Sequence, residues 1–250
     1  MKRILGFSTT NHARVFYIAI PMILSNIAAP LLGLVDTAII GHLPESIYLS
    51  AVALGAMVVS FIYLLAVFLR MTTTGEIAQA FGAQKHTGDT AAQIALTNHA
   101  IWFALLLGTA IILLQPLLLQ LTWWLTAPSE PLKDLTTTYI SIRLWAAPAA
   151  LINLVVLGVL LGRQRSRLAM TLVIFTNAVN LLADVVLIIG LNMNVDGAAW
   201  ASVLAEVSTA VLGLYFLYRE LGYRLHWRLS VGLAKRLLGM NTDVFIRSLV

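Results

Sequence analysis

Long uncharged, apolar runs are the feature that most limits how this chain can fold. Residues 15–35 carry no charged side chain, and apolar residues resume after Asp36 and continue through Ile40. Residues 90–129 contain no Asp, Glu, Lys or Arg. A helix that crosses a bilayer needs roughly 20 predominantly apolar residues. We therefore expect an all-α polytopic membrane protein.

The composition agrees with this class and narrows the chemistry. Hydrophobic residues make up 60% of the chain and charged residues 11%, against about 45–50% and 25% in soluble domains. The absence of cysteine excludes disulfides and thiolate metal sites. The histidines have no helical pairing that would suggest a metal site, and they are His12, His42, His86, His99 and His226. We predict neither a metal nor a cofactor.

Apolar runs and the loops between them predict six spans. These are residues 15–40, 50–69, 95–119, 139–161, 168–190 and 197–218. We interpret residues 1–14 as a lead-in, residues 71–90 as a polar loop with a short amphipathic helix, and residues 219–238 as a basic linker. Residues 239–250 look like the start of a seventh span, which suggests a fragment or a truncated gene product.

Lysine and arginine residues divide unequally between the two sides that six alternating spans create. One side carries Lys133 and Arg143, and Arg247 lies in the last segment. The other side carries Lys2, Arg3, Arg14, Arg70, Lys85, Arg163, Arg165, Arg167, Arg219, Arg224, Arg228, Lys235 and Arg236. Because positive loops stay in the cytoplasm, the N-terminus is predicted to be cytoplasmic. The bias explains the net charge of +5 without nucleic acid and favours contact with anionic membrane lipids.

Two acids interrupt the apolar runs at matched positions. Asp36 lies near the end of the first predicted span and Asp184 near the end of the fifth, and both spans exit outward. With a rise of 1.5 Å per residue, both lie roughly 6–9 Å inside the outer interface. An Asp at the bilayer centre costs on the order of 3 kcal/mol, so a retained acid indicates function. We expect a shared cavity that binds a proton or a small cation; the alternative for Asp36 is a carboxylate that reaches the interface.

Polar residues share one face of the fifth predicted span. Asn177, Asn180 and Asp184 follow the i, i+3, i+7 spacing of a helix stripe. Such stripes face a bundle interior or a water-filled cavity. The alternative for the lone amides and hydroxyls is structural hydrogen bonding between helices.

Other spans add polar residues to the predicted cavity. They are Tyr139 and Asn153 from the fourth span, and Ser202 and Glu206 from the sixth. Glu206 is either a second proton site or the partner of a basic group. Arg143 is expected to pair with a loop acid or a lipid headgroup.

Four segments resemble the multidrug and toxic compound extrusion (MATE) transporters, and within them the DinF-like branch. They are PLLGLVDTAIIGHL at 30–43, TTGEIAQAFGAQ at 73–84, LLGRQRSR at 160–167 and NLLADVVLIIGLNMNVDGAAWAS at 180–202. The resemblance implies the six-helix N-terminal lobe of a twelve-helix fold built from two repeats, plus the start of helix 7. The C-terminal lobe would then be a missing partner.

The resemblance also implies a mechanism and a site. Members export organic cations and other toxic compounds across a bacterial inner membrane, driven by inward proton or sodium flow. The coupling residues would be Asp36, Asn180 and Asp184. The cavity would include Tyr139, Asn153 and Ser202, and the first helix would bend at Pro21 or Pro30, since proline interrupts helix hydrogen bonding.

Three other functions compete with this hypothesis. A lipid-linked oligosaccharide flippase of the same superfamily would need a basic cavity, whereas the buried charges here are mostly acidic. A membrane-embedded prenyltransferase would need clustered acids for a metal, and the sequence has none. A non-transporting lobe that only binds a partner is the third. A lone lobe is predicted to be inactive unless it dimerises or pairs with a second half.

Overall fold

The computed structural model describes residues 23, 39–41 and 45–225. Most of the first predicted span therefore lies outside the described residues, together with Asp36, Pro21 and Pro30. Within the described residues the secondary structure is helical throughout, with no strand. The prediction of an all-α fold is confirmed.

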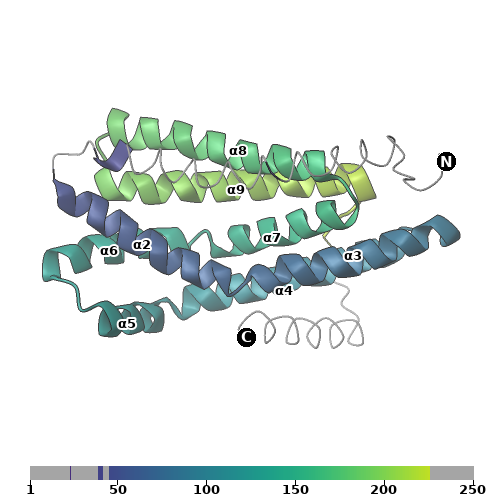
Figure 1. The fold of residues 1–250 in the computed structure, drawn as a ribbon, viewed down its shortest axis with the longest axis horizontal. Helices are drawn as coiled ribbons and strands as arrows, with labels where there is room; N and C mark the ends of the chain where they lie inside the picture. Colours follow the sequence, from purple (N-terminus) through teal and green to yellow (C-terminus); the bar gives the residue numbers. More distant parts are fainter. Residues whose placement is uncertain (1–22, 24–38, 42–44, 226–250) are drawn as a thin grey trace, which may run out of the picture.

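The described helices form an elongated bundle of nearly parallel rods. Their bounds are α2 Ser46–Leu64, α3 Val67–Thr87, α4 Ala91–Leu113, α5 Gln115–Thr126, α6 Glu130–Leu144, α7 Ala147–Gly162, α8 Ser166–Asp184, the π-helix η1 Val185–Gly190 and α9 Asn194–Leu221. Figure 1 shows α8 beside α9, with α7 between this pair and the helices α3 and α4, and with α2 crossing α6. Among the described residues, four helical stretches are long and apolar enough to cross a membrane, or five if α6 and α7 form one broken span. These candidates confirm a polytopic membrane protein.

The segment interpreted as a polar loop with a short amphipathic helix, residues 71–90, is mostly part of one longer helix, α3. The cause is packing that local polarity does not reveal. Gly158 and Gly162 lie one turn apart on α7 and let α3 approach closely. A Cβ at either glycine would lie less than 3.0 Å from a backbone carbonyl oxygen of α3. Small residues four apart commonly bring membrane helices together in this way. Polar residues such as Glu76, which is 3% exposed, are consequently buried on a helix.

The fourth predicted span is broken into two helices. The axes of α6 and α7 differ by 51° across a break of two residues, Trp145 and Ala146. Pro148 explains the break, because proline lacks an N–H and its ring clashes with the carbonyl four residues earlier. Gly108 of α4 packs directly on Pro148, where a Cβ would lie 2.5 Å from its Cα.

Arg163 connects four helices at one end of the bundle. Its guanidinium donates to the Gln93 side chain of α4 and to the backbone carbonyl of Glu220 on α9, and it lies over the Phe81 ring of α3. Burial lowers the pKa of this guanidinium from its usual value, yet an arginine stays charged in proteins. Arg165 adds an ion pair of 2.7 Å with Glu220. The α7–α8 connection and the end of α9 thus bring basic residues to one end, as the charge bias predicts.

Candidate functional site

Asn180 and Asp184 form a buried pair in the last turn of α8. They are 5% and 2% exposed, and the Asn180 Nδ2 donates to the Asp184 Oδ2 over 3.3 Å. The helical spacing alone brings them together, one turn apart. A carboxylate in so apolar a bundle needs polar partners, since an isolated buried charge is costly. The pair can therefore hold a proton or a small cation whose binding neutralises the acid.

The helix changes its winding directly after Asp184. Residues Val185–Gly190 form a π-helix, which is rare and often marks a functional site. Asn192 and Asn194 then take left-handed backbone conformations, with φ of 54° and 48°. Asp184 consequently lies at a junction between two helical geometries rather than within a regular helix.

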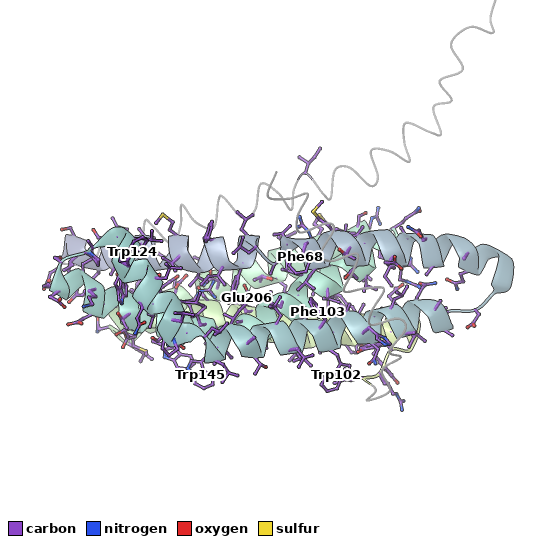
Figure 2. The ribbon with its side chains drawn as sticks, turned by 90° about the horizontal axis from the view of Figure 1, so that it is seen from below. Phe68, Trp102, Phe103, Trp124, Trp145 and Glu206 are labelled. Atoms are coloured by element: carbon purple, nitrogen blue, oxygen red, sulfur yellow. The ribbon has the colours of Figure 1, made fainter. Side chains whose placement is uncertain are left out.

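Glu206 and Asn153 form a second acid–amide pair, this time between two helices. The Asn153 Nδ2 of α7 donates to the Glu206 Oε2 of α9 over 2.7 Å and to the Glu206 backbone carbonyl over 3.0 Å. Figure 2 shows Glu206 inside the bundle, near the middle of its length. The side-chain bond makes the position of Glu206 depend on how α7 and α9 are packed.

A cavity of about 200 Å³ opens beside this second pair. Its polar lining comprises Tyr63, Asn153, Thr176, Asn177, Glu206 and Thr209. Its apolar lining comprises Ala150, Leu154, Leu157, Leu172 and Val173. One acid, one aromatic ring and apolar walls suit the head group of an organic cation.

Arg143 was predicted to pair with a loop acid or a lipid headgroup. The structure buries it inside the bundle instead, so this prediction is wrong. It lies in the last turn of α6, with its Cζ 6.0 Å from the centre of the Tyr63 ring. Its guanidinium donates a hydrogen bond to Tyr139 and interacts electrostatically with Glu206. Gly55 of α2 lets Tyr139 pack closely against that helix, since a Cβ there would lie 2.4 Å from the Tyr139 Cδ1.

The predicted site residues divide into two groups. Asn153, Asn177 and Glu206 line the cavity, whereas Tyr139, which is 4% exposed, and the half-buried Ser202 do not belong to its lining. Asp36 lies beyond the part of the chain that the structure describes. Their assigned roles remain predictions.

Three lining residues were not predicted from the sequence: Tyr63, Thr176 and Thr209. Thr209 lies three residues after Glu206, so helical spacing could have found it. Thr176 was not predicted because only its neighbour Asn177 fits the helical stripe. It shares a 2.8 Å hydrogen bond with Thr209. Tyr63 gave no signal, because a tyrosine in an apolar run is ordinary. Among the described residues, no group of three acids or histidines could hold a metal.

Comparison with known proteins places the chain in one family. The family model described as MatE matches residues 21–186. The DNA damage-inducible protein F of Escherichia coli is 41% identical over 98% of this chain and 54% of its own length. The probable multidrug resistance protein NorM of Neisseria meningitidis is 30% identical over 61% of this chain and 32% of its own length.

A solved structure supports the same assignment. The outward-facing conformation of a multidrug resistance MATE family transporter of the MOP superfamily superimposes with a TM-score of 0.80 at 27% identity. The match covers 93% of this chain and 51% of that transporter. The chain thus spans about half the length of this structure and of the E. coli relative. The resemblance seen in the sequence is confirmed, and the chain belongs to the MatE family.

Proposed function

We propose that this chain forms the N-terminal lobe of a cation-coupled antiporter that exports organic cations and other toxic compounds by alternating access. The family match over residues 21–186 carries the proposal. NorM and the solved transporter are both named for multidrug resistance, and we extend that activity to this chain. The proposed location is a bacterial inner membrane, with a cytoplasmic N-terminus and surrounding lipids as partners.

The proposed coupling site consists of Asp36, Asn180 and Asp184. The buried Asn180–Asp184 contact supports it, because a carboxylate changes its hydrogen bonding when it takes up a proton or coordinates sodium. Bending of the first helix at Pro21 or Pro30 would then shrink the cavity and release the cargo. Ion binding shifts the equilibrium between the two conformations only as far as the affinity for the ion differs between them. The coupling site must therefore differ between the two states.

The chemistry of the cavity favours a cationic cargo. Among the described residues, its lining includes Glu206 and no Lys or Arg. An oligosaccharide diphosphate would need basic residues there, so a flippase is not favoured. Alternating access also needs a facing wall, which a second lobe would supply.

The test is ethidium efflux from a bacterium that lacks its own multidrug pumps. We compare this chain, the chain joined to a second lobe, and Asp36→Asn in each, with Asp196→Asn as the matched control because Asp196 is exposed in the first turn of α9. The joined form should export ethidium, Asp36→Asn should abolish export at equal expression, and Asp196→Asn should not. Export by joined Asp36→Asn at the unmodified rate would exclude Asp36 as a coupling acid.

A further inference from the structure

Two neighbouring spans, α2–α3 and α6–α7, are interrupted in the same way. The interruptions are residues 65–66 and residues 145–146. In each, the N–H of the second residue donates to the carbonyl three residues earlier, which belongs to Tyr63 in α2 and to Arg143 in α6, over 3.0 and 3.1 Å. This spacing is that of a 3₁₀ turn, and such a turn inside a long helical stretch often marks a hinge.

The two interruptions lie at the same level of the bundle, because Tyr63 and Arg143 contact each other. The Arg143 Cζ lies 6.0 Å from the centre of the Tyr63 ring. The guanidinium also donates to Tyr139 of its own helix. Arg143 is thus supported by α2 and α6, the two helices that end at this level.

Close glycine contacts join the helices on each side of this level into a unit. On one side, a Cβ at Gly55 of α2 would lie 2.4 Å from the Tyr139 ring of α6. On the other side, a Cβ at Gly158 or Gly162 of α7 would lie 2.9 or 2.8 Å from a carbonyl oxygen of α3, and one at Gly213 of α9 would lie 2.9 Å from a side-chain methyl of α7. Helices packed this closely cannot slide past each other. Figure 1 shows α2 with α6 in one half of the bundle and α3 with α7 in the other.

The two units meet at Arg143 and Glu206. Helix α9 continues past the interruptions and packs beside α6. Glu206 of α9 accepts from Asn153 of α7 over 2.7 Å, within one unit, and interacts electrostatically with Arg143 of the other unit. The ion pairs within 4 Å in the described part of the chain do not include Arg143 and Glu206. An attraction without a direct hydrogen bond favours one angle between the units and still lets that angle change.

We propose that residues 65–66 and 145–146 form one hinge inside the lobe, about which the α2–α6 unit tilts against the α3–α7–α9 unit. Arg143 is the positioning residue: Tyr63 supports it on the first unit, and its attraction to Glu206 of the second unit holds the hinge at the angle seen here, 51° between α6 and α7. The hinge concerns motion within one lobe, so it goes beyond the proposed function and does not depend on which cargo or ion the protein uses.

The expected movement is large enough to measure. Helix α2 has 19 residues, so at 1.5 Å per residue its far end lies roughly 28 Å from the hinge. A tilt of about 10° displaces Ser50, near that end, by about 4 Å. The chain contains no cysteine, so spin labels attach only at cysteines that are introduced for the purpose.

Double electron–electron resonance on the whole chain in lipid nanodiscs tests the hinge. The cross-hinge pair of labels joins Ser50 of α2 to Asp196 of α9. One pair within a unit joins Ser50 to Thr138 of α6. The other joins Ala83 of α3 to Thr109 of α4, a helix that packs on α7. All five label positions are exposed, so the labels leave the packing intact.

Removing either partner of the attraction should change the cross-hinge distances alone. Arg143→Gln and Glu206→Gln should each shift or widen the cross-hinge distribution by about 3 Å. The double variant should change it no further, because both substitutions act through one interaction. Arg143→Lys keeps the charge and should leave the distribution within about 1 Å. Tyr63→Phe is the matched control, since it keeps the ring and removes a hydroxyl that has no hydrogen-bond partner among the described residues.

The outcomes separate the hinge from a general loosening. Equal changes in the cross-hinge and within-unit distributions would overturn the hinge. An unchanged cross-hinge distribution in Glu206→Gln, or in a monodisperse Arg143→Gln, would overturn the role of Arg143, and Glu206→Gln decides if Arg143→Gln does not fold. Export does not enter the measurement, so the hinge and the proposed transport function can fail separately.

Discussion

The lobe contains two acid–amide pairs that differ in how the chain builds them. Asn180 and Asp184 are neighbours on one helix, and Asp184 is 2% exposed. Asn153 and Glu206 come from α7 and α9, and Glu206 is half-buried beside a cavity. A pair within one helix moves as a unit, whereas a pair between two helices changes when those helices shift. The first geometry suits a fixed ion site and the second suits a contact that cargo can displace.

Their electrostatic surroundings differ as well. Glu206 has Arg143 within electrostatic range, together with Tyr63 and a polar cavity lining. Asp184 lies at the start of the π-helix, with an amide as its neighbour on α8. The comparison teaches that burial alone does not indicate the role of an intramembrane acid. The role depends also on the acid's hydrogen-bond partner and on whether that partner lies on the same helix or on another.

Removing the acid of the intrahelical pair should have the largest effect. Asp184→Asn keeps the shape but cannot exchange a charge, so ion-driven ethidium export should fall about a hundredfold, to background. Resistance to ethidium in a pump-deficient bacterium measures this, with Asp196→Asn as the exposed control. Export by Asp184→Asn at the rate of the unmodified protein would contradict the coupling role that distinguishes Asp184 from Glu206.

Removing the acid of the interhelical pair should have a smaller, cargo-dependent effect. Glu206→Gln should lower export of ethidium about tenfold and export of an uncharged substrate less, because only the cation loses a charged contact. Parallel transport assays with both substrates measure the difference, and Glu130→Gln is the control. Equal losses for both substrates would contradict a recognition role.

Removing the amide that holds Glu206 should have a still smaller effect. Asn153→Ala deletes the 2.7 Å contact but keeps the acid, so the affinity for ethidium should fall about threefold. Titration of ethidium fluorescence measures it. A loss as large as that of Glu206→Gln would show that Asn153 itself contacts the cargo.

A change outside both pairs should affect stability but not transport. Arg163→Gln removes contacts to Gln93 and Glu220 at the basic end, which should lower the free energy of unfolding by about 2 kcal/mol. Thermal unfolding in detergent measures this. Transport measured well below the melting temperature should stay within about twofold, since neither pair is touched. A tenfold loss there would connect the basic end to the transport cycle.

The sequence predicted those features that helical spacing alone determines. The apolar runs indicated membrane helices, and the spacing of Asn177, Asn180 and Asp184 predicted that they share one face of a helix, on which Asn180 and Asp184 are in contact. The alternatives for Glu206, a proton site or the partner of a basic group, stayed open because spacing within one helix says nothing about a neighbouring helix. In the structure Glu206 accepts from the Asn153 amide and interacts electrostatically with Arg143, and both roles stay predictions.

Features that depend on packing between helices could not be predicted in this way. The polar residues 71–90 were interpreted as a loop with only a short helix, but most of them belong to the long helix α3, which packs closely on the glycines of α7. Arg143 was assigned to a surface partner because nothing nearby in sequence predicts the Tyr63 ring beneath it. Both errors arose where residues far apart in sequence, at 63 and 143 or at 74 and 162, meet in space.

Ion-driven accumulation of ethidium in inverted membrane vesicles is the most direct test of cation-coupled export. The protein is expressed together with a second lobe, and a proton or a sodium gradient is imposed across the vesicle membrane. Accumulation should require one of the two gradients and should disappear in Asp184→Asn at equal expression. Accumulation that needs neither gradient, or that persists in Asp184→Asn, would contradict the proposed coupling site.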